Sequence, residues 1–308
     1  MPLYQQVIRT FPNLKPLSAS EELMRPLASA AETFNPAAAV NSIFGANRLG
    51  LVQREARKQA PQYAKASFNT PAVLDSFLGK LPFKKTDSVL DAGSASGALS
   101  FHIAGQVQQV LALDISRHML EEGKKVQLEK KIDNVLFHRA NFNEIPVADG
   151  KFDVVVSRLN LHTSLNPVAH VQELTRVLKP GGVLALIDFT AVGQDPSIKK
   201  RMVELFSLLD RSAVHIHSKE SIAKIFGLNN LEILPEFSHT AEVATPVSEL
   251  LGVYKPNWRE GQIFSNAVTS NFNYPLEDQQ DTGFNPYELD GELVASPAHT
   301  LFVGRKSL

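Results

Sequence analysis

A short apolar run that contains a carboxylate is followed at once by a turn of small residues. Residues 88–97 read Ser-Val-Leu-Asp-Ala-Gly-Ser-Ala-Ser-Gly, with Asp91 near the end of the run and Gly93 and Gly97 in the turn. Residues without bulky side chains let a nucleoside-containing ligand lie against backbone at the carboxyl edge of a parallel sheet. Asp114 follows about one strand-helix-strand unit later, where a carboxylate can bind both hydroxyls of a ribose. The spacing predicts a nucleoside-binding site.

The composition excludes several classes of function. The chain has 308 residues, 44% of them hydrophobic, and its 31 basic and 32 acidic residues leave a net charge of −1. Because no excess of positive charge favours a polyanion, nucleic acid is not expected as the main partner. The absence of cysteine excludes disulfides, thiolate metal sites and cysteine nucleophiles.

The sequence shows no sign of membrane insertion. No apolar stretch approaches the ~18 residues needed to span a bilayer, and the first twenty residues lack the apolar core of a signal peptide. We therefore expect a cytoplasmic protein. An organelle-targeting segment stays open as an alternative, because Arg9 and Lys15 precede the first acidic residue, Glu21.

The first 58 residues are expected to form an N-terminal helical extension. The stretch from Ser18 to Gln59 is rich in Ala, Leu and Glu, and Pro26 and Pro36 interrupt it, which indicates several short helices. An Ala- and Leu-rich face outside the core suggests a homodimer formed through these helices as one hypothesis.

Apolar runs alternate with helical segments from residue 88 to residue 189. Such alternation predicts an α/β fold, with a doubly wound, mostly parallel sheet of seven strands. Thr70, Ser116 and Asn166 are the expected N-cap residues of three of its helices. The expected strands among these runs are 88–93, 109–114, 134–140, 152–159 and 182–189.

The expected core spans residues 59–243 and is completed by a last strand within residues 299–308. An extended run is expected at 231–243. Residues 244–298, with several Pro, Gly and Asn interruptions, are interpreted as a C-terminal insertion. A cover over the substrate and a solvated excursion are both open for a loop of this length.

Five segments in this order and spacing resemble the motif series of class I S-adenosylmethionine-dependent methyltransferases, and most nearly the small-molecule group of the ubiquinone/menaquinone biosynthesis C-methyltransferases. The likeness covers about residues 59–189 and, more loosely, 291–306. It implies a Rossmann-like methyltransferase fold with S-adenosylmethionine as cofactor and S-adenosylhomocysteine as product. The segments are 89–97, 110–119, 140–142, 152–158 and 176–182.

The resemblance also implies roles for individual residues in cofactor binding. Gly93, Ser94 and Gly97 would allow close approach to the methionine portion. The carboxylate of Asp91 would accept hydrogen bonds from its ammonium group, directly or through water, and that of Asp114 would bind the ribose hydroxyls.

The adenine would lie between Ile115 and Met119, with Asn141 at its edge and Phe142 against its face. Arg158 would contact the methionine end through backbone atoms.

Tyr63 matches a tyrosine that covers the cofactor in this family and would hydrogen-bond the methionine carboxylate. A tyrosine at a helix end is equally explained by packing.

Two positions depart from the family pattern. Ala95 replaces the usual middle glycine, and its methyl group is expected to require a negative φ and room near the ligand. Asn141 replaces the usual aspartate but keeps a hydrogen-bond acceptor. These departures motivate an alternative function, in which the fold is kept without methyl transfer, as a non-methylating enzyme that uses the cofactor as a fixed charge or as a binding or regulatory protein.

His162, just beyond the fourth expected strand, is the candidate catalytic residue. It could remove a proton from an acidic carbon, hydroxyl or amine of a methyl acceptor, or it could simply be bonded to a neighbouring loop. His215 and His217 have the i, i+2 spacing of strand residues, but no carboxylate cluster accompanies them, and no metal site is expected.

The resemblance thus implies an enzyme that methylates a carbon or oxygen of a small, apolar or aromatic acceptor. A nicotinamide oxidoreductase is disfavoured because its Gly-x-Gly-x-x-Gly pattern would place glycine where Ala95 and Ala98 occur. Apolar residues of the variable segments could line an acceptor pocket, although packing explains each singly. They are Phe206, Leu208, Leu209, Phe237, Leu250, Leu251, Tyr254, Trp258 and Phe264.

Overall fold

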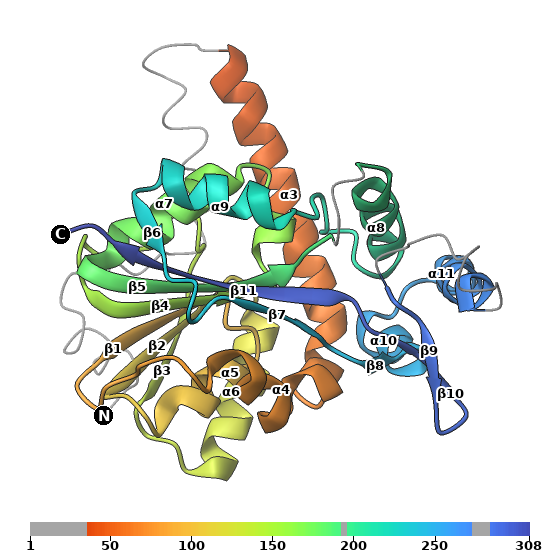
Figure 1. Ribbon diagram of the computed structural model, residues 1–308, viewed down its shortest axis with the longest axis horizontal. Helices are drawn as coiled ribbons and strands as arrows, with labels where there is room; N and C mark the ends of the chain where they lie inside the picture. The colour runs from red at the N-terminus through yellow and green to blue at the C-terminus, as the bar shows by residue number, and fades with distance from the viewer. Residues whose placement is uncertain (1–35, 192–195, 273–283) are drawn as a thin grey trace.

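A mostly parallel sheet forms the centre of the molecule (Figure 1). The computed structural model describes residues 36–191, 196–272 and 284–308. Five strands run parallel, and β11 (Ala298–Lys306) lies antiparallel beside the fifth of them, in the order β3-β2-β1-β4-β5-β11-β6. This confirms the doubly wound α/β fold. The parallel strands are β1 (Ser88–Ala92), β2 (Gln109–Asp114), β3 (Val135–Arg139), β4 (Phe152–Arg158) and β5 (Leu178–Phe189).

The edge of the sheet beyond β11 is one extended run broken into two strands. Both β6 (Leu231–Ile233) and β7 (His239–Glu242) pair with β11. Between them the amide of Leu234 donates to the carbonyl of Val303 at 2.8 Å, and the amide of Val303 donates to Ser238 Oγ at 3.0 Å. The interruption therefore leaves these backbone groups of β11 hydrogen-bonded.

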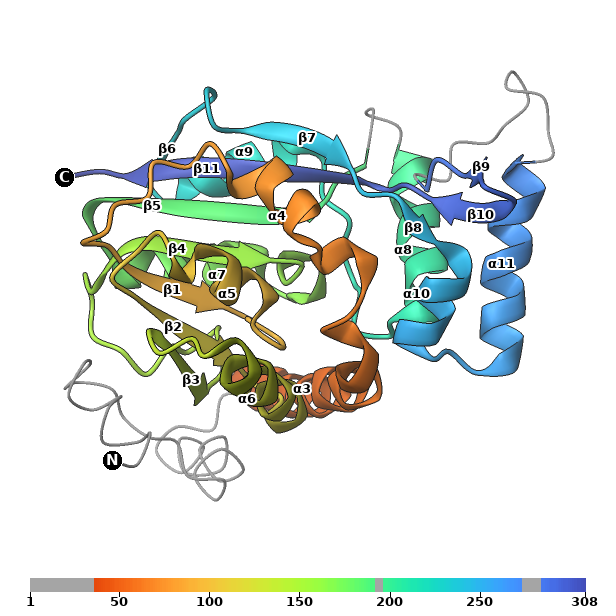
Figure 2. The same ribbon diagram turned by 90° about the horizontal axis from the view of Figure 1, so that it is seen from below.

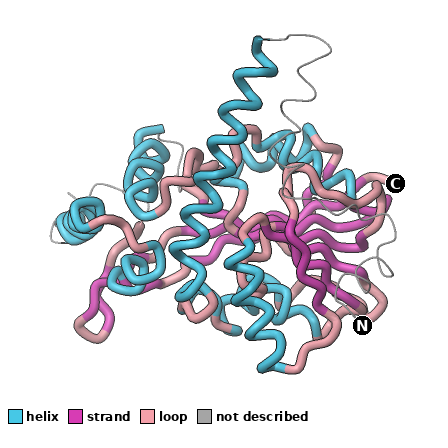
Figure 3. Tube along the Cα trace, turned by 180° about the vertical axis from the view of Figure 1, so that it is seen from behind, coloured by secondary structure: helices cyan, strands magenta, loops and turns pink. Residues whose placement is uncertain are grey.

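Helices cover both faces of the sheet (Figures 1 and 3). Along β1, Val89 packs in the cluster that contains Leu99, whereas Leu90 packs in the cluster that contains Leu174. Both strand residues are fully buried, as expected where a parallel sheet is covered on both sides. One face carries α4 (Pro71–Leu78), α5 (Ala98–Ala104) and α6 (Arg117–Lys130), and the other carries α7 (Pro167–Val177) and α9 (Lys219–Leu228).

The N-terminal extension differs from expectation. Where short helices were expected before residue 59, α3 (Pro36–Tyr63) is one helix of 28 residues. Proline is tolerated at the first helical position, as at Pro36, and Pro61 lies in the last turn. The expected boundary between residues 58 and 59 falls inside this helix, which packs on α6 and on α10 (Val247–Tyr254) of the same chain (Figure 2). The part of the extension before residue 36 lies outside the described residues.

The C-terminal insertion forms a unit beside the carboxyl ends of the parallel strands (Figure 2). In addition to α10 it contains α11 (Trp258–Phe272), which packs on α8 (Pro196–Leu209). Its strands form a second sheet in the order β8-β10-β9. The strands of this second sheet are β8 (Thr245–Pro246), β9 (Tyr287–Leu289) and β10 (Glu292–Ala295).

Among the described residues, no helix combines the length and the apolar character that a membrane crossing requires.

All three expected N-cap residues precede their helices, and two of them make the capping hydrogen bond. Ser116 Oγ accepts from the amide of Met119 at 3.3 Å, and Asn166 Oδ1 accepts from the amide of Ala169 at 3.1 Å. Thr70 has the cap position before α4, but its side chain makes no capping hydrogen bond. Pro71 at the first helical position has no amide N–H, which leaves one fewer unpaired donor at the start of α4.

Two cap substitutions are expected to have different effects on stability. Ser218 Oγ accepts from the amide of Ser221 at 3.3 Å at the start of α9. We expect Ser218→Ala to lower the free energy of unfolding by about 1 kcal/mol, because it leaves a helix amide without its partner. Thr70→Ala, which removes no such bond, is the control and should change little. Urea denaturation of both variants measures the difference, and equal losses would contradict the assignment of the caps.

Candidate functional site

A polar pocket lies at the carboxyl ends of β1, β2 and β4, where open α/β sheets bind ligands. Its walls come from these strand ends, from α3, from the start of α6, from the segments after β3 and α8, and from the end of α10. We call this the polar pocket. It is lined by Val52, Glu55, Ala56, Gln59, Tyr63, Gly93, Ala95, Asp114, Ile115, Met119, Phe142, Arg158, Leu159, Asn160, His162, Thr163, Asp210, Ser212 and Tyr254.

The turn after β1 has three residues in the left-handed region. Gly93 and Gly97 have φ values of 76° and 81°, and Ala95 has a φ of 48°. The expectation that Ala95 needs a negative φ is therefore wrong. A Cβ at Gly93 would lie 2.4 Å from the side-chain Nδ2 of Asn160. This Nδ2 donates a hydrogen bond to the carbonyl of Ala92 at 3.0 Å. Gly93 is thus required by the packing of the protein itself as well as suited to a ligand.

Asp114 at the end of β2 holds this turn in place. Its Oδ2 accepts from the amide of Ala95 at 2.8 Å, and its Oδ1 accepts from the amide of Ser116 at 2.7 Å. Burial raises the pKa of the Asp114 carboxyl to about 6, although these backbone amides oppose the shift. The two bonds also compensate the strained conformation of Ala95.

The other predicted carboxylate, Asp91, lies behind the pocket. Its Oδ2 accepts from Ser100 Oγ on α5 at 2.5 Å, and it does not line the polar pocket. Burial raises the pKa of Asp91 to about 7, whereas the bond from Ser100 lowers it. Asp91 is therefore not placed for direct contact with the ammonium group of a ligand in the polar pocket.

The residues predicted to enclose adenine are only partly brought together. Ile115, Met119 and Phe142 line the polar pocket, but Asn141 does not, and its Oδ1 accepts from the amide of Asn143 at 3.0 Å. Asparagine side chains commonly accept a hydrogen bond from the backbone amide two residues later in a turn, as Asn141 does here.

Two further residues of the turn after β1 lie outside the pocket lining. A Cβ at Gly97 would lie 2.6 Å from the ring of Phe137. Ser94 Oγ is buried and has no hydrogen-bond partner among the described residues.

Tyr63 and Arg158 form one side of the polar pocket. Arg158 Nη2 donates to Asn69 Oδ1 at 2.7 Å, and its guanidinium lies 5.9 Å from the ring centroid of Phe68. Burial raises the pKa of Tyr63, while the charge of Arg158 opposes the shift. The 3-10 helix η2 (Ser67–Asn69) thus positions the Arg158 side chain. The sequence predicted only backbone contacts for Arg158 and no role for its side chain.

His162 is bonded to a buried carboxylate that sequence reasoning missed. Its Nδ1 lies 2.8 Å from Asp188 Oδ1, and its own amide donates to Asp188 Oδ2 at 3.0 Å. Because a carboxylate only accepts, Nδ1 carries the proton and Nε2 is the basic nitrogen of the neutral ring. Burial alone would raise the pKa of Asp188, but His162 holds it below its usual range. The pair has the geometry of a base with its orienting group.

The contribution of α3 to the pocket was also missed. Glu55, Gln59 and Tyr63 recur every fourth residue and so share one helix face. Gln59 Nε2 donates to Asp210 Oδ2 at 2.9 Å, which ties α3 to the segment after α8. The recurrence of Glu55, Gln59 and Tyr63 at every fourth position is the sequence signal that could have revealed this wall.

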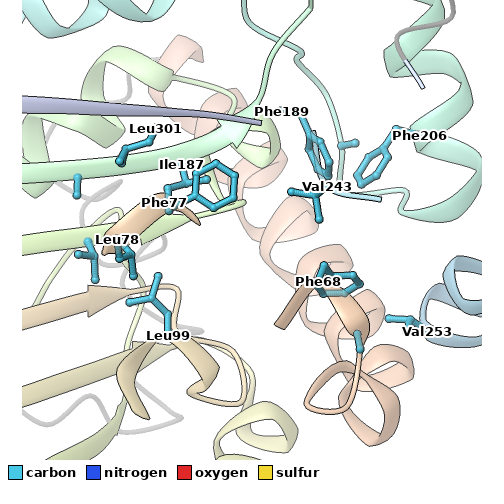
Figure 4. Packing of buried hydrophobic residues seen from close by; sticks show 14 of the residues in the cluster. Phe68, Phe77, Leu78, Leu99, Ile187, Phe189, Phe206, Val243, Val253 and Leu301 are labelled. Carbon is cyan, nitrogen blue, oxygen red and sulfur yellow. The ribbon is translucent and has the colours of Figure 1, made fainter. Parts of the chain in front are cut away.

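An apolar chamber adjoins the polar pocket, and the two share Leu159 and Tyr254. Leu159 has a φ of 57°, a conformation that is strained for leucine and found at functional sites. The rings of Phe189 and Phe206 lie 4.6 Å apart, and Figure 4 shows them beside each other. The apolar chamber is lined by Phe68, Leu159, Phe189, Phe206, Thr245, Leu250, Tyr254, Phe284, Pro297 and His299.

Three of the nine predicted acceptor-lining residues, Phe206, Leu250 and Tyr254, are in the wall of this chamber. Trp258, by contrast, is 81% exposed on α11, and Phe264 is fully buried in the core. Packing in the core therefore explains Phe264, as the alternative interpretation of these apolar residues proposed. The lining of the chamber includes fewer of the nine residues than predicted.

The sheet order and the pocket at its carboxyl edge define a Rossmann-like methyltransferase architecture. A family model described as a methyltransferase domain matches residues 83–233. Residues 83–233 form a methyltransferase domain of the class I S-adenosylmethionine-dependent type, related to the small-molecule enzymes of the ubiquinone/menaquinone group. This confirms the resemblance seen in the sequence.

Two curated relatives illustrate this relationship. A malonyl-[acyl-carrier protein] O-methyltransferase of Enterobacter lignolyticus is 33% identical over 138 residues, covering 45% of this chain and 52% of the relative. A ubiquinone/menaquinone biosynthesis C-methyltransferase of Shewanella piezotolerans is 32% identical over 123 residues, covering 39% and 48%. The chain spans about half the length of these relatives.

The fold itself is shared with a solved structure. The YcgJ protein of Bacillus subtilis superposes with a TM-score of 0.66 at 21% identity, covering 76% of this chain and 98% of that one. At this identity the likeness concerns the fold alone.

Ala95→Gly is expected to stabilise the protein. Glycine adopts a positive φ without strain, so we expect the free energy of unfolding to rise by about 1 kcal/mol. Ala98→Gly, at the first helical residue of α5, is the matched control and should lower it by roughly 0.5–1 kcal/mol. Chemical denaturation of the two variants decides the matter, and a loss of stability in both would show that Ala95 is not strained.

Proposed function

We propose that the protein transfers a methyl group from S-adenosylmethionine to a carbon or oxygen of a small, apolar or aromatic acceptor. The observation that carries this proposal is the junction between the polar pocket and the apolar chamber. His162 lines the polar pocket, and its ring packs at 5.3 Å and 5.5 Å on Phe189 and Phe206 of the chamber. A base thus stands where a polar cofactor site meets an apolar acceptor site.

The residues of the polar pocket fit the cofactor. The Asp114 carboxylate suits a ribose diol, and the apolar side chains of Ile115, Met119 and Phe142 suit an adenine ring. Ser94 Oγ, which has no hydrogen-bond partner among the described residues, lies in the turn between Gly93 and Gly97, next to this lining. When bound, S-adenosylmethionine supplies an electrophilic methyl group on a positively charged sulfur.

Tyr63 and Arg158 would face the methionine end, and Asp91 would support the turn from behind through Ser100. Gly93 and Gly97 give the turn its path.

The chain's own contribution to the reaction is to orient the acceptor and take its proton. His162 Nε2 would receive the proton of the acceptor carbon or hydroxyl, and Asp188 would stabilise the imidazolium that results. Aromatic side chains around the junction would exclude water and hold the acceptor in line. The insertion, through Leu250, Tyr254 and Phe284, would cover the acceptor.

The alternative function is that of a protein of this fold that does not methylate, and it is motivated by Ala95 and Asn141. Incubation with methyl-labelled cofactor and a panel of phenol, 2-naphthol and a cyclic 1,3-diketone distinguishes methyl transfer from this alternative. Label in any panel member at catalytic turnover would establish methyl transfer. Cofactor binding without transfer to any of them would favour the alternative. The homodimer through the N-terminal helices stays a prediction.

We expect the affinity for S-adenosylhomocysteine to rise with pH through Asp114. Its pKa is raised to about 6, so the carboxyl is partly protonated below that pH, and ribose hydroxyls donate best to the ionised form. Calorimetric titrations between pH 5 and 8 should show tighter binding as pH rises. In Asp114→Asn the affinity should fall and the step near pH 6 should vanish. An unchanged step near 6 would exclude Asp114 as its source.

Removal of the proposed base should separate catalysis from binding. We expect His162→Gln to reduce the rate of methyl transfer by roughly 10²–10⁴-fold, and Asp188→Asn to reduce it less, both without loss of cofactor affinity. His217→Gln, which changes a buried histidine outside the lining of the polar pocket, is the control. Initial rates with labelled cofactor provide the measurement. Equal rates in His162→Gln and His217→Gln would leave catalysis to orientation alone.

A further inference from the structure

His299 is a buried histidine in the wall of the apolar chamber. It lies in β11 directly opposite Phe189 of β5, and the two ring centroids are 4.5 Å apart. Most of the chamber lining is apolar, and the other polar side chains in it are those of Thr245 and Tyr254. A histidine is therefore a marked chemical feature of this wall, and the reaction derived above does not use it.

The hydrogen bond of His299 determines which ring nitrogen is an acceptor. Nδ1 lies 2.9 Å from the carbonyl of Pro297, and because a carbonyl only accepts, Nδ1 carries the proton. Burial, and next the charge of Arg158, lowers the pKa of His299 to about 4, so the ring is neutral at neutral pH. Nε2 consequently keeps its lone pair. Within the part of the chain that the structure describes, Nε2 has no hydrogen-bond donor.

A polar acceptor in an apolar wall discriminates between ligands. A ligand that donates a hydrogen bond replaces the water that the nitrogen would otherwise bind, whereas an apolar ligand of the same shape leaves the nitrogen unsatisfied. The position of His299 adds a constraint on size, because His162 and His299 both pack on Phe189. A small ring system can therefore meet His162 with its reacting atom and His299 with a second group.

We propose that His299 determines acceptor specificity, with its Nε2 accepting a hydrogen bond from a hydroxyl or N–H group of an acceptor whose ring system fills the apolar chamber. This inference rests on the proposed function and deepens it. It selects phenol-like or enol-like acceptors, and related N–H compounds, over hydrocarbons of equal size.

The test compares two probes that differ in one donor group. The full-length protein, saturated with S-adenosylhomocysteine, is titrated with 2-naphthol and with naphthalene. One neutral hydrogen bond corresponds to about a fivefold preference for 2-naphthol. In His299→Phe, which keeps a ring against Phe189, 2-naphthol should bind as weakly as naphthalene does, and the affinity for naphthalene should not fall.

The matched control is His239→Phe. His239 lies in β7, which also pairs with β11, but its Nε2 is bonded to the carbonyl of Ser76 and it does not line the chamber. This variant should keep the wild-type preference, and all variants should keep their affinity for S-adenosylhomocysteine.

Three results would overturn the proposal: equal binding of the two probes by the wild type, a preference that persists in His299→Phe, or no binding of 2-naphthol at all. Failure of the wild-type protein to bind S-adenosylhomocysteine would instead count against the proposed function. The probe comparison would then be made on the protein alone and judged by the same criteria.

Discussion

The carboxylate of Asp114 is the interaction on which the geometry of the polar pocket depends. Its two oxygens accept from the amides of Ala95, in the turn after β1, and of Ser116, at the start of α6. The parallel register of β1 against β2, with Asp91 opposite Ala112, brings these two segments side by side. Two charge-assisted bonds therefore connect the turn after β1 with the start of α6. The left-handed conformation of Ala95 persists because this bond holds its amide in place.

Burial of polar groups is the second constraint on the site. Asp188 is fully buried and stays ionised because His162 and backbone amides surround it. Asp91 is equally buried, but its main partner is the neutral hydroxyl of Ser100, and its pKa rises to about 7. The same side-chain type thus has opposite pKa shifts within one sheet edge. The difference follows from the presence or absence of a directly bonded ionisable partner.

The two halves of the site come from different parts of the chain. The methyltransferase domain, residues 83–233, supplies the polar turn, Asp114 and the pair of His162 and Asp188. Much of the wall of the apolar chamber lies outside that segment, on η2, on the C-terminal insertion and on β11, and the α3 wall of the polar pocket lies outside it as well. The apolar chamber therefore depends on segments beyond the methyltransferase domain. His299 belongs to these added segments.

The sequence by itself determined the alternating strands, the glycine turn after β1 and the position of Asp114, because these depend on local periodicity and backbone freedom. It also indicated His162. It did not determine that α3 is one helix whose Gln59 reaches Asp210, since that bond spans 151 residues. The left-handed Ala95 and the partners Asp188 and His299 were likewise decided by tertiary structure. Their roles arise from strand pairing and burial between distant segments, which no local pattern of residues encodes.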